Sequence, residues 1–209
     1  MTTTNNIQIH ESGSYTYDFS EKSGTFDFHI SWWKEVAIYC FVYNADVTAN
    51  ITVQSSDTRA NVSAIVVSSK GIKSTLNITG YVNVSHSIVD IYALSLLGNN
   101  AKATVNGGVV IAPDVQKGEW YLSEENILLW KNITIKSLPM LDVRSNDVKA
   151  SHGAKIDRLD AQKVFYLTAK WLSKSDAEHL MVQSYIQKAL DHANVTDPEN
   201  IIEHIFSIL

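Results

Sequence analysis

The strongest constraint on the fold is a change of sequence pattern close to residue 153. From about Tyr15 to Val148, short segments rich in Val, Ile and Thr recur about every ten residues, for example NITVQ, NVSAIVV and LNITGYVNV. Segments typical of turns separate them, among them SSDTR, SSKG, NGG and APDVQKG. Eight of the nine glycines precede position 150. This first region is therefore predicted to be all-β.

The arrangement of these strands is less constrained. Periodicity alone does not separate a sandwich, a barrel and a solenoid of parallel strands. No repeat of fixed length is present in the sequence, so a solenoid here would be irregular.

After Gly153 the chain contains no glycine, and apolar residues take helical spacing. Three short helices are predicted. The expected N-terminal caps are Asp157 for the first, Ser173 (with Asp176) or Ser175 (with Glu178) for the second, and Thr196, followed by Pro198, for the third. Their apolar stripes must be buried against the β region, within the helical unit, or against a partner.

Composition limits the classes of function. The 209 residues carry a net charge of −5 without a basic block, so neither nucleic acid nor a membrane surface is an expected partner. The polar N-terminus lacks the pattern of a signal peptide, and no apolar run reaches the length of a membrane span. We therefore expect a cytoplasmic protein. The single cysteine, Cys40, cannot form an internal disulfide and is predicted to be a buried apolar residue.

Six Asn-x-Ser/Thr triplets match the glycosylation pattern, and they begin at Asn50, Asn61, Asn77, Asn83, Asn132 and Asn194. A chain rich in Asn, Ser and Thr produces such triplets by composition. We interpret them as turn residues between strands rather than as glycan acceptors.

The segment LDVRSNDVKASHGAKIDRLDAQKVFYLTAKWLSKSDAEHLMV (Leu141–Val182) resembles the C-terminal region of the SufB/SufD family of iron–sulfur cluster assembly proteins. Upstream, NGGVVIAPDVQKGEWYLSEENILL (Asn106–Leu129) resembles the penultimate β-helix turns of that family. The Ser-His-Gly-Ala form at 151–154 is SufD-like. The matching positions include Leu141, Val143, Asp147, Val148, Lys149, Ser151, His152, Gly153, Ala154, Leu159, Asp160, Phe165, Tyr166, Leu167, Ser173 and Ala177.

The resemblance implies a fold and a set of partners. The expected fold is mainly β, a right-handed parallel β-helix (an irregular solenoid, residues 1–154), followed by a small C-terminal α-helical domain (residues 155–209). Such proteins are non-enzymatic scaffolds of the SUF machinery. They pair through the β-helix with a SufB-like or a second SufD-like subunit, as a homo- or heterodimer. Their helical domain docks a SufC-type ATPase, to which ATP hydrolysis belongs. The candidate ATPase-contacting residues are Phe165, Tyr166, Trp171, Leu172, Leu180, Met181 and Tyr185.

His152 is the candidate ligand for iron or a nascent cluster, since imidazole binds iron and titrates near neutral pH. Alternatively, its ring hydrogen-bonds backbone groups where the β-helix ends. The sequence departs from the family in having Ala150 in place of a cysteine, and the large N-terminal helical region of the family is not expected here because the β pattern begins almost at once. With Cys40 as its sole thiol, it is expected to partner a thiol-bearing SufB. No cofactor is expected to bind tightly; a transient cluster is expected in the complex, and flavin binding stays open.

Two rival functions come from other classes. An extracellular carbohydrate-binding or surface β protein would use a tryptophan face, drawn from Trp32, Trp33, Trp120 and Trp130, although packing or a dimer interface explains these residues more simply. A β-helix enzyme acting on polysaccharide would need paired carboxylates across a groove.

Overall fold

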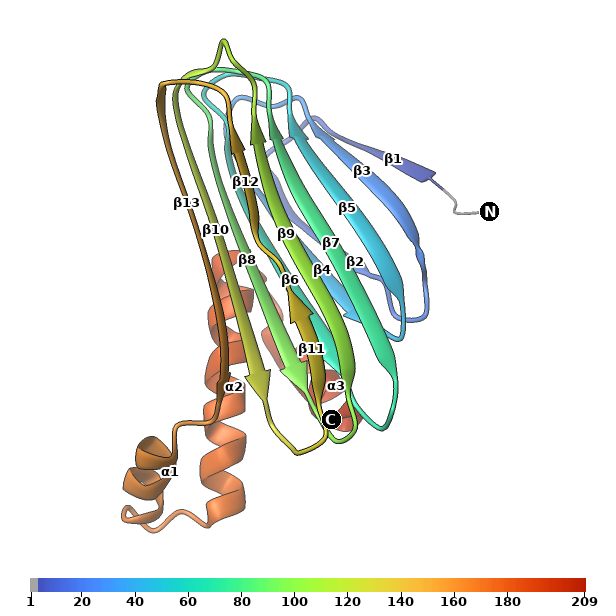
Figure 1. The fold of residues 1–209 in the computed structure, drawn as a ribbon, viewed down its shortest axis with the longest axis vertical. Coiled ribbons are helices and arrows are strands. Elements are labelled where there is room, and N and C mark those ends of the chain that lie inside the picture. Colours follow the sequence, from blue (N-terminus) through green and yellow to red (C-terminus); the bar gives the residue numbers. More distant parts are fainter. Residues whose placement is uncertain (1–3) are drawn as a thin grey trace.

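The computed structural model describes residues 4–209 as a flattened coil of parallel strands with three helices (Figure 1). Sheet A contains β1 (Thr4–Ile9), β3 (Gly24–Ile30), β5 (Asp46–Val53), β7 (Lys73–Val82), β9 (Lys102–Ile111), β11 (Thr134–Ser137) and β12 (Met140–Val143). Sheet B contains β2 (Gly13–Asp18), β4 (Glu35–Tyr43), β6 (Arg59–Ser68), β8 (Ile88–Leu97), β10 (Gln116–Leu128) and β13 (Asp147–Arg158).

The chain alternates between the two sheets, and each strand pairs in parallel with the strand of the next turn of the coil. This arrangement confirms a parallel β-helix-like solenoid over a sandwich or a barrel. Its turns lengthen along the chain: Thr4 lies beside Thr25, 21 residues on, whereas Lys73 lies beside Lys102, 29 residues on. The changing length explains why no fixed repeat is visible in the sequence.

The core lies between the two sheets. Inward-facing side chains of successive turns stack in register, as Ile38, Val62 and Ile91 do. The largest of them is the fully buried Trp120 of β10, whose ring passes over Gly80 of β7. A Cβ atom at Gly80 would lie 2.6 Å from Cζ3 of that ring, so the position needs glycine.

The helices are α1 (Ala161–Thr168), α2 (Lys174–His192) and α3 (Pro198–Ile208). Apolar side chains of α2 and α3, such as Ile186 and Ile205, pack on the outer face of sheet B, which presents Phe41, Ile65 and Leu94. Of the three ways to bury the helical stripes, packing on the β region is therefore correct for α2 and α3. In contrast, α1 packs on α2 and has no buried residue. Among residues 4–209, no helix is both long and apolar enough to cross a bilayer.

Several predicted boundaries differ from the structure. Strands begin at Thr4 rather than near Tyr15, and β13 continues to Arg158, past the predicted boundary between residues 154 and 155. The helical spacing after Gly153 is overridden because this segment pairs along its length with β10. The NGG segment expected to form a turn lies inside β9, where Gly107 makes room for inward side chains of β10.

The caps are partly as predicted. Ser173 caps α2, with its hydroxyl accepting from the Asp176 amide. The first helix is capped by Asp160 instead of Asp157, since Asp157 belongs to β13. The third begins after Asp197 rather than Thr196, without a side-chain capping hydrogen bond.

The assignment of all six Asn-x-Ser/Thr triplets to turns is wrong for three of them. Asn50, Asn61 and Asn77 lie within β5, β6 and β7. Side-chain amides there bond to the neighbouring strand, as when Asn50 Nδ2 donates to Asp27 Oδ1 (2.7 Å). The other three triplets begin outside regular strands and helices.

Candidate functional site

The last turn of the coil leaves one long strand edge uncovered. β13 is the edge strand of sheet B, paired with β10 on one side only. All of its residues from Ser151 to Arg158 are exposed. A long free edge presents unpaired backbone donors and acceptors and is a template for pairing with another chain.

His152 lies in the middle of β13, not at a junction between strand and helix. It is in register with Leu122, whose side chain is buried in the core between the sheets. Because residues in register face the same side of a sheet, His152 projects toward the inside of the coil. Among residues 4–209 no strand pairs with the other edge of β13, and the imidazole is exposed.

Behind this end, the interior of the coil becomes polar. Glu124 occupies a stacked position that Cys40, Ala64 and Ala93 fill in the preceding turns. Its carboxylate Oε1 accepts from the Gly107 amide (2.6 Å), and its Oε2 accepts from the Ser137 hydroxyl. Burial raises the pKa of the Glu124 carboxyl, and these two hydrogen bonds, with a smaller contribution from His152, offset only part of that rise.

The polar interior coincides with a break in sheet A. β11 ends at Ser137, β12 begins at Met140, and both pair with β9. Pro139 lies in the break and has no amide hydrogen to give to a ladder. Sequence reasoning missed Glu124, although strand alternation from Trp120 and Leu122 indicates an inward position for it.

A second candidate surface lies on the helical unit. Phe165, Tyr166 and Trp171 are 74%, 62% and 96% exposed, and Leu180 is exposed as well. The other proposed contact residues are less accessible: Leu172 and Tyr185 are half-buried, and Met181 is buried. Phe165 and Tyr166 belong to α1, Trp171 lies between α1 and α2, and Leu180 belongs to α2. We refer to these four exposed side chains together as the α1 aromatic surface.

Metal ligands are sparse. Within residues 4–209, no group of three or more His, Cys, Asp or Glu side chains is arranged to hold a metal ion. Cys40 is fully buried, as predicted, and burial raises the pKa of its thiol to about 12.

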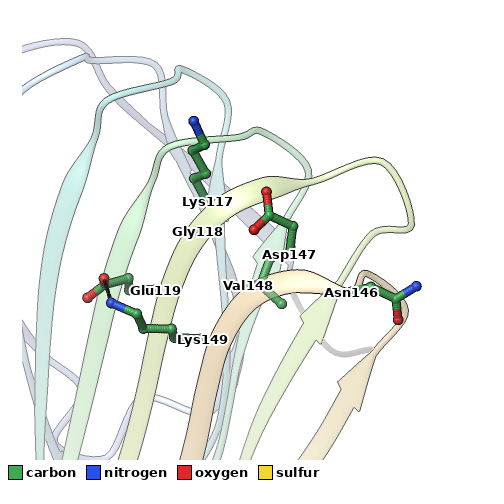
Figure 2. A pocket seen from close by; sticks show the side chains of 7 residues that line it. All are labelled: Lys117, Gly118, Glu119, Asn146, Asp147, Val148 and Lys149. Carbon is green, nitrogen blue, oxygen red and sulfur yellow. Dashed lines mark hydrogen bonds and ion pairs between the residues drawn. The ribbon is translucent and has the colours of Figure 1, made fainter.

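A hollow of about 270 Å³ lies where β10 and β13 begin. Figure 2 shows the side chains that line it. The Lys149 amine, which donates to Glu119 Oε1 (2.6 Å), spans the two strands at its edge, and Lys117 and Asp147 complete its charged lining. The hollow is below the roughly 300–1,000 Å³ typical of ligand pockets, and most of the side chains that line it are charged or polar. It is a weak candidate for a small-molecule site.

The tryptophans form no common face. Trp120 is a core residue, as the packing interpretation predicted. The exposed Trp33 follows a strand of sheet A and the exposed Trp130 follows a strand of sheet B, so they lie at opposite edges of the flattened coil.

These features define a parallel β-helix protein whose open end and exposed helix suit association with other proteins. Residues 4–185 match the family described as "SUF system FeS cluster assembly, SufBD core domain". The chain belongs to this family.

Curated relatives agree with this assignment. The chain is 26% identical over 91 residues to "Iron-sulfur cluster assembly protein SufD" of Escherichia coli, covering 44% of this chain and 22% of the relative. It is 27% identical over 141 residues to a SufBD family protein of Synechocystis, covering 68% of this chain and 31% of the relative. A SufBD family protein of Archaeoglobus fulgidus is 26% identical over 103 residues, with shares of 44% and 28%. The matches span less than a third of each relative.

Proposed function

We propose that this chain is a SufD-like scaffold subunit for iron–sulfur cluster assembly that docks a SufC-type ATPase through the α1 aromatic surface. Family membership supports the assembly role, and the exposure of α1 supports the docking. In this role the chain is not an enzyme, and its partner hydrolyses ATP. We propose the cytoplasm as its location.

The observation that carries the docking proposal is Trp171. Its side chain is 96% exposed, and its backbone has φ +73°, in the left-handed region. A bulky residue in that region costs about 1–3 kcal/mol, and Trp171 gains almost no burial in return. Folding of this chain alone does not explain the residue, whereas burial in a partner's pocket does.

Pairing is proposed at the open end of the coil, through the free edge of β13. A second subunit adding a strand there would cover exposed apolar side chains such as Ile156 and Val143. It would also enclose His152, so that its imidazole and ligands from the partner hold the cluster in transit. Iron and sulfide are then cargo rather than resident cofactors.

Co-purification with the SufC-type ATPase of the same organism tests the docking proposal. The Phe165→Ala/Trp171→Ala variant should weaken binding about 30-fold or more, because truncating an aromatic anchor costs about 2 kcal/mol or more. Trp130→Ala is the matched control: it removes an equally large exposed ring from the β coil and should leave binding unchanged. Absence of binding by the well-folded wild-type chain would refute the docking proposal.

A further inference from the structure

Under α2, the outer face of sheet B carries a charged cluster for which the proposed function gives no role. Glu125 of β10 is at its centre. The Lys188 amine of α2 donates to Glu125 Oε1 (2.8 Å), and the Tyr92 hydroxyl of β8 donates to Glu125 Oε2 (2.9 Å). The same amine lies 4.5 Å from the centroid of the Tyr92 ring. One carboxylate thus joins a helix to two neighbouring strands.

The cluster extends to the edge strand. Glu125 is in register with Lys155 of β13, and Lys155 pairs with Asp157 along the same strand (3.1 Å). Partial burial alone would raise the pKa of Glu125, but hydrogen bonds from Lys188 and Tyr92, together with the charges of Lys188 and Lys155, hold it below its usual value. The carboxylate is therefore charged at neutral pH and attracts both amines.

The cluster lies in the part of α2 that packs on sheet B. From Val182 onward, α2 contributes side chains to the apolar layer on sheet B. Before that point, α2 and α1 extend beyond the end of β13 (Figure 1). Lys188 therefore attaches α2, on which α1 packs, to β10, the strand adjacent to β13.

We propose that Glu125 is a positioning residue that couples α2 to the edge strand β13. A displacement of α2 moves the Lys188 amine, and Glu125 transmits this movement to β10 and to the paired strand that carries His152. The importance of this coupling for cluster assembly rests on the proposed function. The coupling itself is a property of the free chain and can be measured there.

Amide hydrogen exchange in the full-length free chain provides the test. Lys188→Met removes the amine but keeps a long side chain. It should speed exchange about tenfold at the β13 amides that pair with β10 between Ala154 and Arg158, because a charge-assisted contact is lost. Glu125→Gln should act similarly, and the double variant should add little. Lys188→Arg, which keeps the charge, should restore slow exchange.

Glu119→Gln is the matched control. It removes a different β10 carboxylate, which forms an ion pair with Lys149 of β13; within residues 4–209 the polar partners of Glu119 are Lys149 and Tyr121, and neither lies on a helix. Exchange between Ala154 and Arg158 should not change in this variant. Unchanged β13 exchange in Lys188→Met would overturn the proposal, as would equal acceleration in β4 and β6, because the helix would then simply have detached.

A second experiment measures amide hydrogen exchange in the complex with the ATPase, with and without nucleotide. In the wild-type complex, nucleotide binding to the ATPase should change amide exchange in β13. Glu125→Gln should bind the ATPase as wild type does but lose this change. A normal nucleotide response in Glu125→Gln would contradict the coupling. Failure of the wild-type chain to bind would instead contradict the proposed function, with the free-chain result still deciding the coupling.

Discussion

Replacing the buried Glu124 by Gln should remove one contribution to the pH dependence of stability. Because the pKa of Glu124 is raised in the folded chain, the unfolded chain releases this proton at lower pH. The carboxyl therefore contributes stability that is fully present below about pH 4.5, its ordinary pKa, and is lost as pH rises through the folded pKa. The loss cannot exceed about 1.4 kcal/mol per pH unit for one proton.

Glutamine keeps the shape of the side chain and can still accept from the Gly107 amide, so at pH 4 the two proteins should differ by about 1 kcal/mol or less. Urea unfolding followed by tryptophan fluorescence at one-unit steps from pH 4 to pH 8 measures the difference. The free energy of unfolding of Glu124→Gln should rise relative to that of the wild type as pH rises. Other titrating groups are common to both proteins and cancel.

Glu119→Gln should show the opposite trend. The hydrogen bond from Lys149 lowers the pKa of Glu119, so its contribution is present above its ordinary pKa and lost as pH falls through the folded pKa. The free energy of unfolding of the wild type should therefore rise relative to that of Glu119→Gln as pH rises. For Glu124, a difference in free energy of unfolding between wild type and Glu124→Gln that does not change with pH would refute a raised pKa of the Glu124 carboxyl.

Three further predictions concern packing, capping and reactivity. Gly80→Ala should lower the free energy of unfolding by about 1–3 kcal/mol in urea titrations, because its Cβ overlaps the buried Trp120 ring; an unchanged midpoint would mean that the core has room to adjust. Ser173→Ala should cost about 1 kcal/mol through loss of the α2 cap, measured the same way, and an equally stable variant would count against that cap. Cys40 should resist a thiol reagent in the native chain and react on unfolding, since it is buried with a raised pKa; rapid native labelling would disprove this.

The sequence predicted well what depends on local pattern. Strand content, the burial of Cys40 and Ser173 as one of the two proposed α2 caps follow from residue type and spacing, whereas the irregular solenoid was implied by the family resemblance. Prediction failed where a long-range pairing decides local structure. Ser151–Arg158 resembles a turn and a helix start when taken alone, yet it is a strand because β10 offers a full-length partner.

The candidate sites likewise divide into features that local pattern predicts and features that depend on long-range pairing. His152 was identified from its motif, but its place in the middle of an edge strand, in register with Leu122, depends on pairing across about 30 residues. Glu124 and Glu125 are adjacent in the sequence and have opposite environments, one inside the coil and the other beneath α2. Strand alternation predicts that they face opposite sides, but only the packed structure identifies Gly107 and Lys188 as their partners.

The packing of α2 and α3 across several turns of the coil has a consequence for how the chain unfolds. In a solenoid without such cover, each turn contacts its neighbours alone, and unfolding can proceed as unzipping from either end. Here the helices pack on Phe41 of β4, Ile65 of β6, Leu94 of β8 and Ile127 of β10. These four strands must therefore lose the packing of the helices together. We expect them to unfold as one cooperative unit rather than turn by turn. β1 at one end and β13 at the other contribute no side chain to this apolar layer, so the two ends of the coil in the described chain should fray first.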